Sequence, residues 1–241
     1  MNRTEALKQA KPILFNTEMV RDILDGRKTK TRRVIKKPYY IDDADVCRVS
    51  GFAMHSGTNA TDGMPYPDRP YQLGDILYVR ETWGCYEDNW MDAPYFLYRA
   101  DYPDGEKGYW YEPEQIHFCD LPRWRPSIHM PKEAARIFLR VKNVGADRLL
   151  FPFYADGSTI FEFQKEGIDI GDHCRKCIET YGEPSCIESS SDTECTMLDM
   201  VRNSLKELWN STIPKKDFDR YGWNANPWVW MYEFERIEVT E

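Results

Sequence analysis

The chain has 241 residues, aromatic side chains make up 14% of it, and its formal net charge is -8. The aromatic content excludes a disordered or low-complexity protein. The acidic balance argues against a broad, non-specific nucleic-acid binder, and no apolar run approaches the roughly 20 residues of a membrane span. The polar start of the chain lacks the apolar core of a signal peptide, and an odd number of cysteines, seven, fits reduced thiols. We therefore expect a cytoplasmic globular protein.

The first third of the chain predicts a strand, a helix and a second strand. Residues 1–11 show no clear pattern and are expected to form a loose lead-in. A short strand over 13–15 leads to a helix with an apolar face, which Asn16 or the next residue caps and Gly26 ends. The following strand is predicted over 29–35.

Patterns in the rest of the chain predict further strands and an amphipathic helix. The strands are expected over 76–81, 95–100, 136–144 and 228–239, and Leu198, Val201, Leu205 and Leu208 mark the helix. A shorter helix is expected over about 158–166. Turn-rich or acidic stretches without periodicity are interpreted as insertions, over about 38–70, 101–122 and 169–196.

These elements predict one mixed α+β domain over residues 1–241, mainly antiparallel. No G-x-G-x-x-G motif and no regular strand–helix alternation supports a doubly wound fold. A small β-barrel with a few flanking helices and long insertions fits better.

A basic stretch lies between the predicted helix and the strand that follows it. Between Gly26 and Lys37 there are seven Lys or Arg residues and no acid. This predicts a site for an anionic or strongly polar ligand. A solvated basic strand that holds phosphate or aids solubility is the alternative. Alternation places Thr29, Thr31 and Arg33 on one side of the strand and Lys30, Arg32 and Val34 on the other.

Lys28 and Thr31 are the chemically suggestive pair of this stretch. A threonine hydroxyl becomes a nucleophile when a base takes its proton, and a lysine can act as that base only if its pKa falls. Four neighbouring cations favour such a fall through like-charge repulsion. They are Arg27, Lys30, Arg32 and Arg33.

The stretch Gly26-Arg27-Lys28-Thr29-Lys30-Thr31-Arg32-Arg33 resembles the signature of the ASCH family, whose members have a PUA-like barrel. The resemblance extends to Gly74-Asp75-Ile76-Leu77-Tyr78-Val79, to Phe138-Leu139-Arg140-Val141 and to Trp230-Met231-Tyr232-Glu233-Phe234. With Tyr-Gly-Trp-Asn-Ala-Asn-Pro-Trp at 221–228, the chain is similar to longer members found in phage and prophage genomes. The resemblance covers the strands and the first helix, and it excludes the three insertions.

Some ASCH proteins hydrolyse acetylated cytidine with a lysine, a threonine and a glutamate. The resemblance implies that Lys28, Thr31 and Glu166 are these catalytic residues. Lys28 would accept the proton of Thr31, Thr31 would attack the amide carbonyl, and Glu166 would protonate the leaving nitrogen. The known amide hydrolases of the family are compact, whereas this chain carries large insertions that would reshape or cover the cleft. An exposed acid at a helix end is the other interpretation of Glu166.

Four cysteines in the third insertion have the number and first spacing of a structural zinc site. They are Cys174, Cys177, Cys186 and Cys195, and the first two form a C-x-x-C motif. Four thiolates bind Zn(II) tetrahedrally, and a metal would organise a segment too polar to build a core. The alternative is four unrelated reduced cysteines, because the second pair lacks a C-x-x-C knuckle. No cofactor is expected for catalysis.

Aromatic side chains offer surfaces on which a base can stack. Most, such as those that alternate through 228–234, are expected in the core. Trp83 and Trp223 each precede or follow a glycine and are the better candidates for a pocket wall. With Arg27, Arg32 and Arg33 they form the predicted substrate-binding set. Ser127 and His129 lack an accompanying acid or nucleophile elbow, which disfavours a serine hydrolase.

Three functions follow as hypotheses. The first is a protein that binds a nucleoside or nucleotide and hydrolyses an amide on a modified pyrimidine such as acetylated cytidine. The second is a non-catalytic module that binds single-stranded RNA or DNA, in which cations contact phosphate and aromatics stack on bases. The third is a protein-interaction role for the acidic insertion that carries the cysteines.

Overall fold

The computed structural model describes most of the chain. The described residues are 1–36, 39–41, 46–49, 52–55, 69–86, 95–102, 108–112, 115–119, 123–150, 163–168 and 196–240. The helix expected over 158–166 falls largely outside them, as do the four cysteines of the third insertion.

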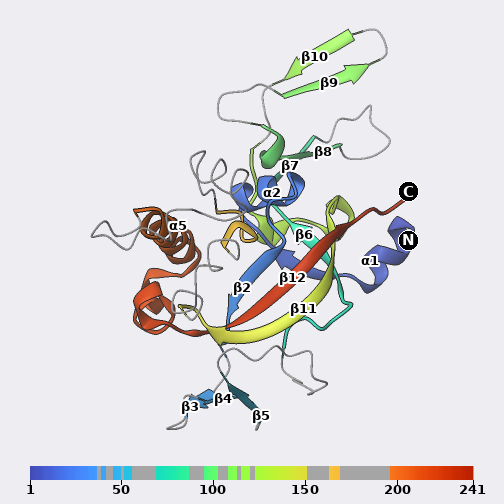
Figure 1. The fold of residues 1–241 in the computed structure, drawn as a ribbon. Helices are drawn as coiled ribbons and strands as arrows, with labels where there is room; N and C mark the ends of the chain where they lie inside the picture. The colour runs from blue at the N-terminus through green and yellow to red at the C-terminus, as the bar shows by residue number, and fades with distance from the viewer. Residues whose placement is uncertain are drawn as a thin grey trace, which may run out of the picture. The chain divides into compact units, whose positions relative to one another are not determined.

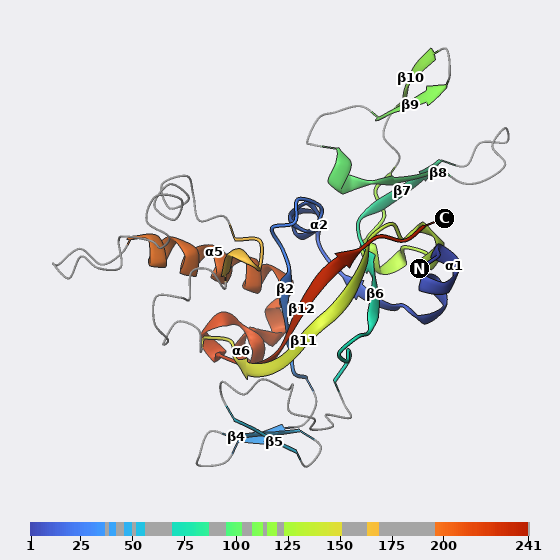
Figure 2. The same ribbon diagram turned by 45° about the vertical axis from the view of Figure 1, so that its right-hand side comes forward.

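A five-stranded sheet carries the strands that the sequence predicts most clearly (Figure 1). Its strands, in spatial order, are β1 (Lys11–Leu14), β6 (Ile76–Arg80), β11 (Phe138–Arg148), β12 (Trp228–Ile237) and β2 (Lys30–Val34). β1 pairs with β6 in parallel, whereas β6–β11 and β12–β2 are antiparallel. In both ribbon views β11 and β12 run side by side (Figure 2). The predicted strands over 13–15, 29–35, 76–81, 136–144 and 228–239 are thus confirmed within a few residues.

Short strands also form within two of the stretches interpreted as insertions, where the sequence pattern predicted none. A three-stranded sheet contains β3 (Tyr39–Ile41), β4 (Val46–Val49) and β5 (Phe52–His55), and a hairpin contains β9 (Gly108–Glu112) and β10 (Gln115–Cys119). Strands of three to five residues are too short for a clear period of two, which is why the pattern missed them. The predicted strand over 95–100 is β8 (Tyr95–Tyr98), which pairs with β7 (Trp83–Tyr86).

The described residues form four α-helices. They are α1 (Arg3–Gln9), α2 (Thr17–Leu24), α5 (Thr196–Thr212) and α6 (Phe218–Tyr221). α2 and α5 confirm the two helices expected from their apolar faces, and the Asn16 side chain caps α2 by accepting from the Met19 N–H at 2.8 Å. The loose lead-in predicted for residues 1–11 was wrong. The Asn2 side chain caps α1, and Ala6 is fully buried in the core.

Two compact units divide the described chain. Unit 1 comprises Met1–Gly26, Gly74–Val141 and Glu235–Glu241, and unit 2 comprises Arg27–Leu73 and Lys142–Phe234. Each has its own apolar cluster. The cluster of unit 1 is built from Ala6, Ala10, Ile76, Tyr78, Trp83, Met130, Ala134, Ala135 and Phe138. The cluster of unit 2 is built from Leu149, Phe163, Ile168, Val201, Leu205, Trp209, Trp223 and Val229.

The fold is therefore mixed, with mainly antiparallel sheets, as predicted. The described strands do not close a barrel, since β1 and β2 are the two edges of the central sheet. No helix in the described ranges combines the length and the apolar character needed to cross a membrane.

Candidate functional site

The basic stretch begins where α2 ends. Gly26 has a φ of +75°, the left-handed conformation that glycine adopts without steric cost at a helix C-terminus. This turn releases the chain into residues 27–29 and then into β2. Arg27, the first cation after the turn, is exposed.

Lys28 is held by the turn that contains Glu166. The two residues form an isolated antiparallel bridge, and the Lys28 Nζ donates to the Glu166 backbone carbonyl at 2.7 Å. The N–H groups of Thr29 and Lys30 both donate to the Lys165 carbonyl at 2.8 Å. Backbone and side chain together therefore fix the start of β2 against residues 163–168.

Arg32 approaches the same turn. Its guanidinium forms an ion pair with the Glu166 carboxylate and lies 5.2 Å from the centre of the Phe163 ring. Lys28 is 2% exposed, Arg32 6% and Glu166 5%, so this is a buried ionic group with two cations and one acid. The contact brings the charges together without the angles of a hydrogen bond. The contact is an ion pair between two buried groups of opposite charge.

Thr31 lies on the opposite face of β2. Successive side chains of a strand point to opposite faces, and cross-strand partners share a face. Thr31 is paired with Tyr232 and Arg33 with Trp230, whereas Arg32 is paired with Met231. Thr31 is 3% exposed, so its hydroxyl is buried on the side of Arg33 and Tyr232.

That face carries a group of arginines and tyrosines, which we call the tyrosine–arginine cluster: Arg33, Arg69, Tyr71 and Tyr232. The Tyr71 and Tyr232 rings meet edge to face, with centres 5.1 Å apart. Burial lowers the pKa of the Arg33 guanidinium, and the nearby Tyr71 and Tyr232 oppose this effect. Burial likewise raises the pKa of Tyr232 far above its ordinary value, although Arg33 and Arg69 act against it.

Several polar atoms at these two faces are buried without a hydrogen-bond partner among the described residues. They are the Nε and terminal nitrogens of Arg32, the Nε of Arg69 and the Tyr232 hydroxyl. The Tyr71 backbone lies close enough to the Tyr232 hydroxyl to affect its pKa, but the geometry falls short of a hydrogen bond. Buried polar groups in folded proteins are nearly always satisfied, so these atoms leave hydrogen-bonding capacity that the described residues do not fill.

The remaining cation of β2 has a partner across the sheet. Lys30 is paired with Glu233 in the register, and its Nζ lies 3.3 Å from the Glu233 carboxylate. Lys30 is 9% exposed, whereas the Glu233 side chain is 36% exposed. The solvated-strand alternative does not describe Lys28, Lys30 and Arg32, because all three are buried.

The structure thus brings together part of the predicted site. Lys28, Arg32 and Glu166 meet, and Arg33 joins Thr31 on the other face. The interpretation of Glu166 as an exposed helix-end acid is wrong. Trp223 belongs to the apolar cluster of unit 2. Trp83 belongs to that of unit 1, and its ring lies 5.0 Å from the Arg125 guanidinium.

Two features of the structure do not follow from the sequence pattern. Tyr71 was assigned to the end of an insertion. It lies shortly before the turn at Gly74, which leads into β6. In unit 1, the fully buried Glu81 accepts two hydrogen bonds from Arg136, at 2.9 and 3.0 Å. The Arg136 guanidinium also lies 4.0 Å from the Tyr98 ring and donates to Asp101 at 2.6 Å. No motif links these residues in the sequence, so only the fold reveals the network.

The four predicted zinc ligands, Cys174, Cys177, Cys186 and Cys195, lie outside the described residues. Within the described ranges no group of three or more His, Cys, Asp or Glu side chains is arranged to hold a metal. Comparison of the chain with models of protein families, with curated proteins and with solved structures finds no match.

Proposed function

We propose that this chain binds a nucleoside or nucleotide at the tyrosine–arginine cluster on the Thr31 face of β2. The observation that carries the proposal is the set of buried hydrogen-bonding groups there that lack a partner among the described residues, on Arg69 and Tyr232. A pyrimidine offers carbonyl oxygens and a flat ring, which suit guanidinium donors and tyrosine faces. Arg33 and Arg69 supply positive charge for a phosphate.

The Lys28–Arg32–Glu166 group fixes β2 from the opposite side of the strand. Its hydrogen bonds and ion pair hold the start of β2 against residues 163–168. A rigid strand keeps Thr31 and Arg33 in place before a ligand arrives, which lowers the entropic cost of binding.

Amide hydrolysis is the second candidate, favoured by the contact between Lys28 and Glu166. The geometry supports it less well than binding. The Lys28 amine donates to a carbonyl, the Glu166 carboxylate pairs with Arg32, and strand alternation turns Thr31 away from both. The hydrolytic mechanism requires these groups to change partners when substrate binds.

The proposal also includes membership of the ASCH family with its PUA-like barrel. Its support is that the stretches carrying the resemblance fall on β2, β6, β11 and β12 of a single sheet. Two features of the described strands differ from a closed antiparallel barrel. β1 pairs with β6 in parallel, and β1 and β2 are open edges of the sheet.

Titration calorimetry with cytidine, cytidine monophosphate and acetylated cytidine tests the proposal. Arg33→Met and Tyr232→Phe should each weaken binding roughly tenfold, because each removes a polar contact made in a buried site. Arg140→Met is the matched control, since Arg140 is an exposed cation of β11 paired with Glu235. Equal affinity of the wild type, Arg33→Met and Tyr232→Phe would contradict binding at this cluster.

The same samples decide between binding and hydrolysis. Chromatography of acetylated cytidine after incubation measures the release of cytidine. Turnover that disappears in both Lys28→Ala and Thr31→Ala supports the hydrolytic mechanism, and turnover that survives in both contradicts it. Binding without turnover leaves the chain as a nucleoside- or nucleotide-binding protein.

A further inference from the structure

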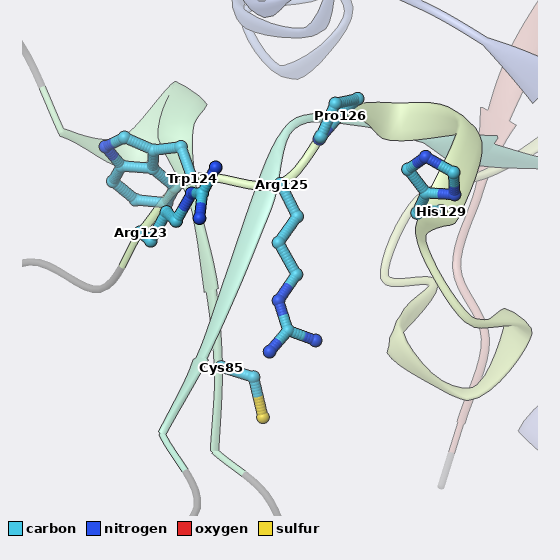
Figure 3. Close-up of a pocket in the computed structure, with 6 residues that line it drawn as sticks. All are labelled: Cys85, Arg123, Trp124, Arg125, Pro126 and His129. Atoms are coloured by element: carbon cyan, nitrogen blue, oxygen red, sulfur yellow. The ribbon is translucent and has the colours of Figure 1, made fainter.

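Unit 1 contains a pocket that plays no part in the proposed function. Its volume is about 400 Å³, and the described residues that line it are Cys85, Arg123, Trp124, Arg125, Pro126 and His129. Figure 3 shows the Arg125 side chain extending toward Cys85, with Trp124 and Arg123 on one side and His129 on the other.

The walls of this pocket are held by backbone contacts. Arg125 and Trp83 exchange two backbone hydrogen bonds, at 2.8 and 3.2 Å, which extend β7 by one bridge. Trp83 and Cys85 are two residues apart on β7 and therefore face the same side. The Arg125 side chain extends toward Cys85, and its guanidinium lies 5.0 Å from the centre of the Trp83 ring. The arginine is thus directed into the pocket by the strand.

The opposite wall is a 3₁₀ turn, Ser127–His129. The Arg80 guanidinium donates to the Ile128 carbonyl, and the Glu81 N–H lies 3.2 Å from the Met130 sulfur. Both contacts attach the turn to the end of β6. These contacts fix the backbone that carries the His129 side chain, which lines the pocket.

The chemistry of the lining is cationic and aromatic. Two guanidiniums and one imidazole face the pocket, and none of its described lining residues is an acid. Trp124 is half-buried, its ring centre lies 6.0 Å from that of Tyr102, and the Arg99 guanidinium lies 5.7 Å from it. Guanidinium groups bind phosphate through paired N–H donors, and an indole face stacks on a base.

We propose that this pocket binds the phosphate and the adjoining base of a nucleotide, either free or within a single strand. Arg123 and Arg125 bind the phosphate, and Trp124 stacks on the base. Because every residue involved belongs to unit 1, the site is independent of the tyrosine–arginine cluster in unit 2.

Cys85 provides a reporter inside the pocket. The alkylation rate of Cys85 by N-ethylmaleimide, followed by peptide mass spectrometry, is measured with uridine, uridine monophosphate, inorganic phosphate or a short oligouridylate, and the other cysteines serve as internal references. We expect uridine monophosphate to slow the reaction at Cys85 selectively. Calorimetry with uridine monophosphate in the Arg33→Met background, where binding at the tyrosine–arginine cluster is weakened, measures the same binding without depending on thiol reactivity.

Variants separate this pocket from the site on β2. Arg123→Gln and Arg125→Gln should each weaken binding of uridine monophosphate roughly tenfold, because each removes a charge-assisted hydrogen bond. Lys8→Gln, an exposed cation of α1 in the same unit, should leave it unchanged. Arg33→Met should also leave protection of Cys85 unchanged, so that failure of one proposal is distinguished from failure of the other.

The probes identify the source of the phosphate. Protection by uridine monophosphate supports a free nucleotide. Protection by the oligouridylate alone, weakening with salt, supports a single strand. Equal protection by uridine and uridine monophosphate would overturn phosphate recognition. The proposal also fails if neither phosphorylated probe protects Cys85 or binds in calorimetry, or if both arginine variants bind as the wild type does.

Discussion

At the scale of the residue, burial decides what each cation of the basic stretch does. Lys28 and Arg32 are withdrawn from water and share one turn with Glu166, whereas Arg27 remains exposed. A charge in the interior is costly unless it is paired. The Glu166 carboxylate therefore has a structural task, which is to balance the buried charge of β2.

Replacing Glu166 with Gln tests that task. Removal of one partner leaves a buried Arg32 uncompensated, so the free energy of unfolding should fall by about 3–5 kcal/mol. Urea denaturation measures the change. Glu233→Gln is the matched control, because it breaks a partly exposed pair with Lys30 and should cost less than about 1 kcal/mol. Stability that stays constant or rises in Glu166→Gln would contradict the balancing role and would suit an acid kept for catalysis.

Tyr98 gives a prediction about pH in unit 1. Its hydroxyl donates to the Ala134 carbonyl at 2.6 Å, and burial raises the pKa of Tyr98 to about 12, although the charge of Arg136 acts against this. Between its ordinary pKa, 10.0, and about 12, the folded protein keeps a proton that the unfolded chain releases. The free energy of unfolding should therefore fall as pH rises through this window.

Tyr98→Phe is the variant that isolates this effect. The wild type should be more stable than Tyr98→Phe below pH 10, by about 1 kcal/mol for the lost hydrogen bond. Denaturation at a series of pH values should show the difference shrinking toward about 12. A difference that is independent of pH across the window would refute the assigned cause.

At the scale of the element, the sequence predicts those helices and strands whose apolar residues recur with a clear period. β11 and β12 and the helices α2 and α5 were expected, because apolar residues recur in them at the spacing of a strand or a helix. α1 was missed because its polar seven-residue sequence buries only Ala6. Its signal was the N-cap Asn2 with Glu5 three residues later, a weak cue without an apolar face.

The candidate site was predictable in part for a related reason. Alternation along β2 separates Thr31 and Arg33 from Arg32, and the register with β12 agrees. The partner of Arg32 did not follow from the pattern, because Glu166 is more than a hundred residues away and only tertiary packing selects it. The same holds for the contacts of Tyr71 with Tyr232 and of Arg125 with Trp83. Each joins two segments that no sequence pattern relates.

At the scale of the whole molecule, the zinc hypothesis remains a prediction. Protein purified without a histidine tag should contain about one zinc ion per chain, as measured by plasma emission spectrometry, because four thiolates complete a tetrahedral site. Replacing Cys174 and Cys177 together with Ser should remove the metal. The matched control is Cys85→Ser, which changes a cysteine of unit 1 that is not one of the predicted ligands. Absence of zinc from the wild type would refute the site.

The pairing of β2 with β12 also has a consequence for how the protein forms. Thr31 and Tyr232 are neighbours across the sheet but about two hundred residues apart along the chain, a contact of very high order, which slows folding. During synthesis on the ribosome, β2 emerges well before its partner β12. A chain that stops before β12 lacks Tyr232 and therefore cannot assemble the tyrosine–arginine cluster.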